Sequence, residues 1–208
     1  MTEKRSITAE DRTLKYLKQT VEKIYKSFIQ TCDILSKKYP YLYRELPQKI
    51  TFVTSQELED RYPDETPEKR EYLIVKKHKA VFVIWIGDRL KSGTVHWKRS
   101  PDYDDRKLDW DWIMYDEKFD RTIEISSMWI RVSGKSLLEQ LEKSDKMEKI
   151  KLPYHQSILK KELPYTIWWW IGMTRLVMFI LWVYHIAEVQ ASSRETSTLK
   201  EIKCTPYL

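Results

Sequence analysis

The sequence predicts an α+β domain in which mixed or antiparallel strands are covered by helices. Three observations lead to this prediction. Residues 9–38 repeat apolar side chains every three or four positions, which is typical of one long amphipathic helix. Residues 79–86 form a near-continuous apolar run rich in β-branched side chains, which indicates a buried strand. Strand patterns return at 112–116 and at 121–132.

The elements of the first half are bounded by recognisable signals. Pro40 stops the long helix, and a short strand, KITFV, spans 49–53. Thr54 and Glu57 form a capping-box pattern ahead of a short helix. Pro67 stands at the first position of the next helix.

A long polar loop is predicted over residues 87–111, between buried strands, and such loops are usually functional. The second half of the chain is then predicted to contain strands at 112–116 and 121–132, a helix at 134–144, a helix from Pro153 to Leu163, a strand at 165–171 and a strongly apolar helix at 173–186.

Composition excludes several classes of protein. Of the 208 residues, 33% are charged and 42% hydrophobic, which argues against wholesale disorder and against several membrane spans. Cys32 and Cys204 match no zinc or redox spacing, and the N-terminus lacks a signal peptide, so we expect a cytoplasmic protein. The net charge of +6 suits a protein that handles phosphates, nucleotides or RNA, although a lysine-rich solvated surface explains it as well.

One apolar stretch raises the question of a membrane span. Residues 167–184 contain a single charge, Arg175. A central arginine costs about 2.5–3.5 kcal/mol on insertion scales, and no stop-transfer pattern accompanies the stretch. We therefore expect a buried strand, a turn at Gly172 and a buried helix from Thr174, with no membrane partner.

The first candidate site is the segment HWKRSPDYDD at 96–105. It places Arg99 near Tyr103 and Asp104. An arginine for a carboxylate and an aspartate for an ammonium would together hold a zwitterion. A solvated acidic turn is the alternative.

The second candidate site is the apolar strand at 122–132, which contains Glu124. Strict alternation places Glu124 and Ser126 on one face and Ser127 on the other. A glutamate in an apolar strand is costly unless it is paired or binds a metal, and Mg²⁺ that bridges to nucleotide phosphates suits it. An exposed sheet face is the alternative.

The third candidate site lies at 167–181, where a strand meets a helix at Gly172 and Arg175 falls in the first turn. Helix N-termini favour anions, so the helix dipole does not account for an arginine there. It would instead hold a phosphate together with the helix end. The alternative is a surface arginine over an apolar helix.

These three segments, in this order, resemble the ammonia-dependent asparagine synthetase family (aspartate–ammonia ligase, AMP-forming). That family has the fold of class II aminoacyl-tRNA synthetase catalytic domains, so the resemblance implies an antiparallel sheet flanked by helices. It covers nearly the whole chain. The matching stretches are ITFVTSQELEDRYP at 50–63, AVFVIWIGDRLKSGTVHWKRSPDYDD at 80–105, LDWD at 108–111, IEISSMWIRV at 123–132, LPYTIWWWIGMTRLVMFIL at 163–181 and HIAEVQA at 185–191.

The resemblance implies an adenylation reaction. ATP and L-aspartate would form a β-aspartyl adenylate and pyrophosphate, and ammonia would displace AMP to give asparagine. Arg175 matches the arginine that contacts ATP phosphate, Glu124 the carboxylate that holds Mg²⁺ and ATP, and Asp111 is a second candidate for the metal. The full-length enzyme would be a homodimer with no nucleic-acid partner.

The same resemblance implies the remaining site residues. Arg99, Tyr103 and Asp104 match the loop that recognises aspartate, with Arg99 also a catalytic candidate. Further substrate-binding candidates are Ser126, Ser127 and Arg131, and ATP-binding candidates are Trp168, Trp169, Trp170, Gly172 and Arg175.

The chain departs from the family at its N-terminus. Family members begin well before the region that matches Met1, so residues 1–208 resemble the C-terminal portion of one synthetase-like catalytic domain. We expect this chain alone to be inactive or severely impaired. A catalytically inactive class II synthetase-like paralogue that acts as a binding module is the alternative.

The second departure concerns tryptophan. The chain has nine Trp and four Gly, whereas average usage gives roughly 15 Gly for this length. Tryptophan stands at six family glycine positions: 85, 110, 129, 168, 169 and 170. One hypothesis is that the source reads the codon UGA as glycine; exchange of all nine would give 13 Gly. The other is a degenerate paralogue that has lost ATP binding.

Overall fold

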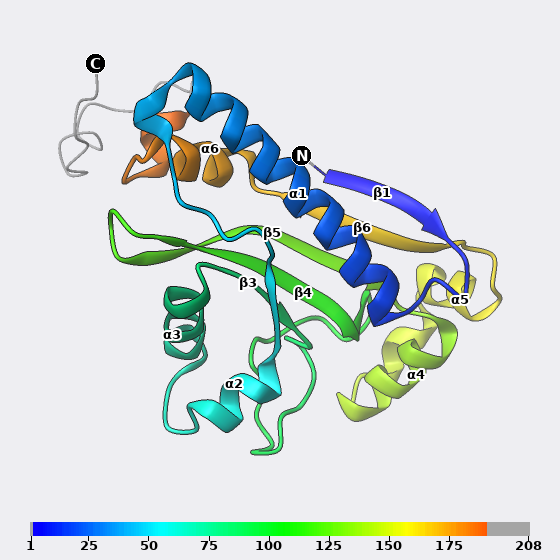
Figure 1. Ribbon diagram of the computed structural model, residues 1–208. Helices are drawn as coiled ribbons and strands as arrows, with labels where there is room; N and C mark the ends of the chain where they lie inside the picture. The colour runs from blue at the N-terminus through cyan, green and yellow to red at the C-terminus, as the bar shows by residue number, and fades with distance from the viewer. Residues whose placement is uncertain (1, 191–208) are drawn as a thin grey trace.

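The computed structural model describes residues 2–190, which form one six-stranded sheet in the order β1-β6-β5-β4-β3-β2 (Figure 1). Every pair of neighbours is antiparallel except β2 and β3, which run parallel. The α+β prediction is therefore confirmed. The strands are β1 (Thr2–Ile7), β2 (Thr51–Thr54), β3 (Ala80–Ile84), β4 (Asp104–Asp116), β5 (Arg121–Arg131) and β6 (Tyr165–Ile171).

The helices cover the two faces of the sheet unequally. In Figure 1, α1 crosses one face with α6 beside it, α2 and α3 lie on the opposite side, and α4 and α5 lie at one end. The helices are α1 (Leu14–Lys38), α2 (Ser55–Arg61), α3 (Pro67–His78), α4 (Gly134–Lys143), α5 (Pro153–Leu159) and α6 (Met173–Leu181), with 3-10 turns at Pro40–Leu42, Met147–Lys151 and Ile186–Val189.

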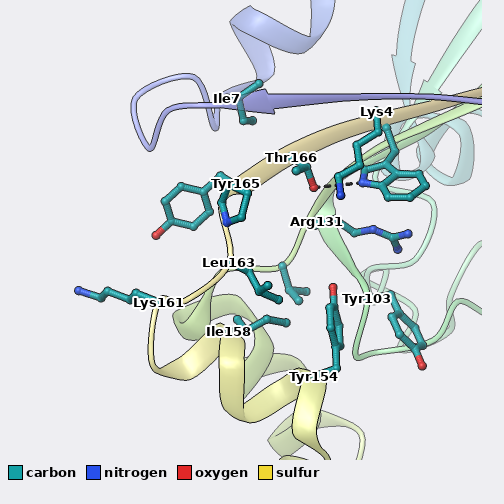
Figure 2. A pocket seen from close by; sticks show the side chains of 13 residues that line it. Lys4, Ile7, Tyr103, Arg131, Tyr154, Ile158, Lys161, Leu163, Tyr165 and Thr166 are labelled. Carbon is teal, nitrogen blue, oxygen red and sulfur yellow. Dashed lines mark hydrogen bonds between the residues drawn. The ribbon is translucent and has the colours of Figure 1, made fainter.

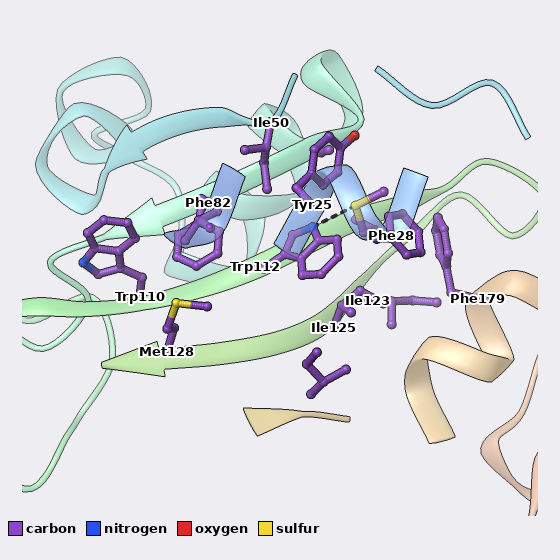
Figure 3. Packing of buried hydrophobic residues seen from close by; sticks show 14 of the residues in the cluster. Tyr25, Phe28, Ile50, Phe82, Trp110, Trp112, Ile123, Ile125, Met128 and Phe179 are labelled. Atoms are coloured by element: carbon purple, nitrogen blue, oxygen red, sulfur yellow. Dashed lines mark hydrogen bonds between the residues drawn. The ribbon is translucent and has the colours of Figure 1, made fainter. Parts of the chain in front are cut away.

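The main hydrophobic core lies between the sheet and α1 (Figure 3). Tyr25 and Phe28 of α1 meet the indole of Trp112 edge-on, with ring centroids 5.7 and 5.2 Å apart. Phe179 of α6 extends this core, since its ring lies 6.2 Å from that of Phe28. A second, smaller core on the other face joins β2 and β3 to α2 and α3. The open part of that second face is the place left for a site.

The first predicted helix is shorter than the sequence pattern suggested. It begins at Leu14 rather than at residue 9, because the Thr13 side chain caps it by accepting from the Tyr16 amide. Residues 2–7 form strand β1, which no sequence signal predicted. This strand is almost wholly exposed and is defined by its pairing with β6. The capping box at Thr54 and Glu57 is confirmed.

Three further boundaries were misplaced. Strand β4 begins at Asp104, so the loop predicted over 87–111 ends at about residue 103. Helix α5 ends at Leu159 rather than 163. Helix α6 ends at Leu181 rather than 186, because Trp182 takes the left-handed conformation that closes a helix.

A β-bulge between β4 and β5 overturns the strict alternation expected for the strand at 122–132. Trp112 pairs with Ser126, but the next residue, Ile113, pairs with Glu124. One residue of β5 is thus left over, and the faces exchange at this point. Glu124 and Ser127 share a face, whereas Ser126 turns to the opposite one with Trp112.

The apolar stretch at 167–184 divides between β6 and α6, as predicted. Within residues 2–190, no helix has both the length and the apolar character that crossing a membrane requires.

Candidate active site

The residues of interest lie on the sheet face opposite α1, here called the site face. Antiparallel partners share a face, so the pairing of Asp111 with Ser127, and of Ser127 with Trp170, sets these three side chains in a row across β4, β5 and β6. The pairing of Asp109 with Trp129 places both residues on the same face. The long loop after β3 and the first turn of α6 complete the surroundings.

A continuous line of polar contacts crosses this face, here called the polar line. Arg175 Nη1 lies 3.5 Å from Glu124 Oε1. The Ser127 hydroxyl lies 3.0 Å from that same glutamate oxygen and 2.7 Å from Asp111 Oδ1. Arg99 Nη2 donates to Asp111 Oδ2 at 2.7 Å. Arg175, Glu124, Asp111 and Arg99, which were proposed separately from three segments, are therefore brought together.

Burial changes the acidity of the aspartates on this face. It raises the pKa of Asp111 to about 6, against the opposing effect of Arg99 and with help from Glu124. Burial also raises the pKa of Asp109 well above its ordinary value, again opposed by Arg99. Neither carboxyl oxygen of Asp109 has a hydrogen-bond partner within the described part of the chain. Burial thus favours the protonated form of Asp109.

Glu124 and Asp111 fit a magnesium ion that is shared with phosphates. Both carboxylates approach the Ser127 hydroxyl, and Mg²⁺ is usually bound by one or two carboxylates together with substrate phosphates and water. In the part of the chain that the structure describes, no three His, Cys, Asp or Glu residues could hold a metal by themselves. The donor set thus suits a metal that arrives with a phosphate ligand.

The cavity that contains Glu124, Asp111 and Arg175, of about 460 Å³, is separate from a second one of about 590 Å³. Figure 2 shows Arg131, Tyr103 and Tyr154 around the second cavity, with Lys4 above them. Arg131 Nη1 donates to Asp104 Oδ1 at 2.6 Å, and its guanidinium faces the ring of Tyr103 at 5.9 Å. Cations and a carboxylate here suit a small zwitterion.

The loop that carries Arg99 and Tyr103 is anchored by the buried carboxylate of Asp102. The side chain of Asp102 is 1% exposed and accepts from Lys149 Nζ at 2.8 Å and from His155 Nε2 at 3.2 Å. Ser100 also donates to this carboxylate. Asp102 therefore ties the loop to helix α5 and the turn before it.

Helix α6 places Arg175 as predicted, in its first turn after Gly172. A side chain at Gly172 would meet the ring of Trp170 at 3.3 Å and Arg175 Cδ at 3.5 Å. The small residue thus lets the indole of Trp170 and the arginine lie close together at the start of the helix.

Two proposed residues do not reach the site. Ser126 is buried and pairs with Trp112 and Ile171, which lie in the core under α1. Trp169 pairs with Met128 and packs against the same core. Trp168 and Trp170 do lie on the site face, and the indole of Trp168 faces the Arg131 guanidinium at 4.6 Å.

Sequence reasoning missed Asp109 on the site face and two residues that line the larger cavity. Asp109 could have been found from LDWD, because residues two apart share a strand face and Asp111 was already a candidate. Lys4 and Tyr154 line the larger cavity from β1 and α5. No motif marks them, since only the tertiary fold brings them near Arg131.

Comparison with known proteins identifies the family. The profile of the aspartate-ammonia ligase family matches residues 3–205. Over 186 residues the chain is 51% identical to an aspartate–ammonia ligase of Clostridium perfringens, covering 89% of this chain and 55% of that one. An aspartate–ammonia ligase of Lactobacillus johnsonii is 51% identical over 187 residues, which cover 89% of this chain and 56% of that one. The chain spans about half the length of these curated relatives.

Solved structures agree on the fold. The asparaginyl-tRNA synthetase of Entamoeba histolytica in complex with asparaginyl-adenylate superposes with a TM-score of 0.55 at 16% identity, over 91% of this chain and 45% of that one. The asparaginyl-tRNA synthetase of Pyrococcus horikoshii complexed with asparaginyl-adenylate superposes with a TM-score of 0.56 at 17% identity, over 89% of this chain and 44% of that one. The sheet is thus that of class II aminoacyl-tRNA synthetases, and by its sequence the chain belongs to the aspartate–ammonia ligase family.

Proposed function

We propose that the protein is an ATP-dependent ligase that makes L-asparagine from L-aspartate and ammonia through a β-aspartyl adenylate. The observation that carries the proposal is the polar line, which gathers two arginines and two carboxylates around Ser127 in a chain of this family. A site with this mixture of charges can bind phosphates and a metal at once.

The proposed reaction has two steps. An oxygen of the aspartate side-chain carboxylate attacks the α-phosphorus of ATP, and the bond to pyrophosphate breaks. The nitrogen of ammonia then attacks the activated carbonyl carbon and loses a proton, and AMP leaves with the electron pair of the broken C–O bond. Neither step needs a covalent bond to the protein, so catalysis consists of positioning and charge neutralisation.

The nucleotide end of the site is proposed at the smaller cavity. Arg175 would neutralise phosphate charge, with the start of α6 beside it. Glu124 and Asp111 would hold Mg²⁺, which supplies positive charge to the phosphates. Because Arg99 contacts Asp111 at 2.7 Å, it keeps this carboxylate oriented and lies where it can also contact the substrate.

The amino-acid end is proposed at the larger cavity. The Arg131 guanidinium would bind a carboxylate of aspartate, and Asp104 would bind the ammonium group. Arg131 and Asp104 form an ion pair with each other at 2.6 Å. A bound zwitterion would replace this pair with two new ones, its carboxylate to Arg131 and its ammonium to Asp104. Tyr103, which stacks on Tyr154 with ring centroids 5.7 Å apart, forms one wall. Resemblance to the family also leads us to propose a homodimer in the cytoplasm.

The proposal is tested with the whole protein as its source makes it, because residues 1–208 alone are expected to be inactive or severely impaired. We expect aspartate-dependent exchange of pyrophosphate into ATP, and ¹⁵N-labelled asparagine when labelled ammonium is added. Binding of ATP without any exchange would instead identify the non-catalytic binding module. Exchange followed by transfer of aspartate to tRNA but not to ammonium would reject ammonia as the acceptor.

A pair of matched variants separates the site from general effects. Glu124→Gln removes a charge of the polar line and should lower the exchange rate by about 100-fold or more. Glu45→Gln removes an exposed carboxylate and should leave the rate unchanged. Equal rates in the two variants would contradict the role given to Glu124.

A further inference from the structure

The strongest unexplained feature of the molecule is the backbone at two tryptophans. Trp85 has φ +64° and Trp182 has φ +57°. A bulky residue in this left-handed region is a genuine outlier, whereas glycine enters it freely. The other described non-glycine residues with positive φ are Asp120 and Asp145, of a type that tolerates it better, and Lys79 and Lys161, which stand just past the ends of α3 and α5.

Hydrogen bonds fix both conformations. The Trp85 amide donates to the Asp109 carbonyl at 3.2 Å, and its carbonyl accepts from Ser55 Oγ at 2.7 Å. The Trp182 amide donates to the carbonyls of Met178 and Phe179, as in a helix cap where glycine is usual. Backbone hydrogen bonds therefore hold both residues at these φ angles.

The indole groups give a second, independent observation. The Nε1 atoms of Trp85, Trp110 and Trp129 are buried and have no hydrogen-bond partner, although buried indoles usually find one. Trp97 differs, because its Nε1 donates to Glu71 Oε1 at 2.7 Å. Trp112 differs as well, since its Nε1 lies 2.9 Å from Met114 Sδ and its ring packs against two aromatic rings of α1.

The location of the remaining indoles is the third observation. Trp168 lines the larger cavity and the ring of Trp170 reaches the start of α6 beside Arg175, so indoles stand on the site face between the two cavities. Residues 168–170 are also the three consecutive glycines of the family pattern. Loss of the Trp168 and Trp170 side chains would therefore open space on the site face beside Arg131 and Arg175.

We infer that the protein made in its source carries glycine at residues 85, 110, 129, 168, 169, 170 and 182, through reading of the codon UGA as glycine. Tryptophan is retained at residues 97 and 112, which match no family glycine and where the indole has partners. Trp168 Nε1 also donates to Thr166 Oγ1 at 3.1 Å, but this indole stands in the larger cavity and at a position that matches a family glycine. The set thus differs from the nine positions considered from composition alone. It leaves out 97 and 112. It adds position 182 to the six that match family glycines, because backbone geometry identifies 182 without any comparison of sequences.

The test is peptide sequencing of the protein from its source, and it requires no activity. The tryptic peptide Leu108–Lys118 contains positions 110 and 112, and we expect Gly in the first and Trp in the second. Peptides Ala80–Arg89, Thr122–Arg131 and Glu162–Arg175 should show Gly at the proposed positions and no Trp. Tryptophan at 85 or at 168–170 would overturn the inference. Glycine at 112 or 97 would overturn the division between the two sets.

The gene and two recombinant chains give a further test. We expect UGA at the seven codons and UGG at 97 and 112. When expressed from genes that specify each residue unambiguously, the chain with seven glycines should have a higher Tm than the chain with seven tryptophans, whereas Trp112→Gly should lower the Tm. A more stable seven-tryptophan chain would contradict the inference. Because these measurements do not depend on catalysis, they can fail while the proposed function stands, and the reverse.

Discussion

At the scale of single residues, neighbouring charges in the site shift one another's pKa values. Asp111 is held between the cation of Arg99 and the carboxylate of Glu124, and burial raises its pKa to about 6. A group that titrates so close to neutral pH, next to a like charge, is prepared for a divalent cation, because the cation favours the ionised form.

The pKa of Asp111 leads to a prediction of pH dependence. The folded chain keeps this proton up to about pH 6, against an ordinary value of 3.8, so the folded state binds more protons between these values. The free energy of unfolding should therefore fall as pH rises from about 4 to about 6. Denaturant titrations across this range should show the fall in the wild type and a weaker one in Asp111→Asn. Identical slopes in the two proteins would refute the assignment.

Single residues were easier to predict than their grouping. Arg175, Glu124 and Arg99 are unusual for their local patterns, a charge in an apolar strand or a cation at a helix start, so each could be found alone. Ser127 was placed on the wrong face, because a bulge depends on the pairing of two strands and leaves no mark in either one.

At the scale of elements, the buried carboxylate of Asp102 is one of the anchors of the long loop before β4. Asp102 binds Lys149 and His155, and so joins the loop to the end of the molecule that contains α5. The same loop carries Arg99 and Tyr103. The positions of these two side chains therefore depend on the contacts of Asp102.

Removal of the charge on Asp102 should be costly. Asp102→Asn leaves the Lys149 ammonium, whose side chain is 30% exposed, beside a buried neutral amide. Loss of a hydrogen bond to a charged group in this way costs about 1.5–3 kcal/mol. Chemical denaturation should show this loss, and the loop should become more sensitive to protease. Asp64→Asn, at an exposed position, should change stability by less than about 0.5 kcal/mol. A loss of less than about 1 kcal/mol for Asp102→Asn would show that the anchor is unimportant.

Elements with local signals were predicted well, and elements defined by contacts were not. The capping box before α2 and the proline at the start of α3 lie within a few residues of what they cap. Strand β1, by contrast, reads as a polar TEKRSI, and only its pairing with β6 makes it a strand. The end of α6 depends on the left-handed backbone of Trp182. Tryptophan is not a residue that signals the end of a helix, so the sequence did not predict this boundary.

At the scale of the whole molecule, one face of the sheet is closed by α1 and α6 and the other holds the site. The long apolar stripe of α1 packs across several strands, so this helix keeps the central sheet in shape without touching the cavities. The larger core thus lies on the face opposite the site, and the smaller core shares the site face.

This division predicts different costs for two truncations on the same helix. Phe28→Ala removes a ring that contacts Trp112 and Phe179 in the core and should cost about 3–5 kcal/mol of stability. Ile34→Ala, at a side chain that is 67% exposed, should cost less than about 0.5 kcal/mol. Thermal unfolding monitored by circular dichroism measures both, and similar costs would mean that α1 does not carry the core.

The bulge in β5 also restricts how the chain can change in length. Beyond the bulge the strand runs in the opposite phase, so loss or gain of one residue between Glu124 and Ser127 would turn Arg131 into the core and Met128 out of it. Such a change would not be tolerated singly, whereas the hairpin turn at 117–120 lies outside the paired residues of β4 and β5 and can change in length without shifting their register. The number of residues between Glu124 and Arg131 is therefore as strongly constrained as the identities of these two residues. Insertions in relatives should be confined to the turn at 117–120.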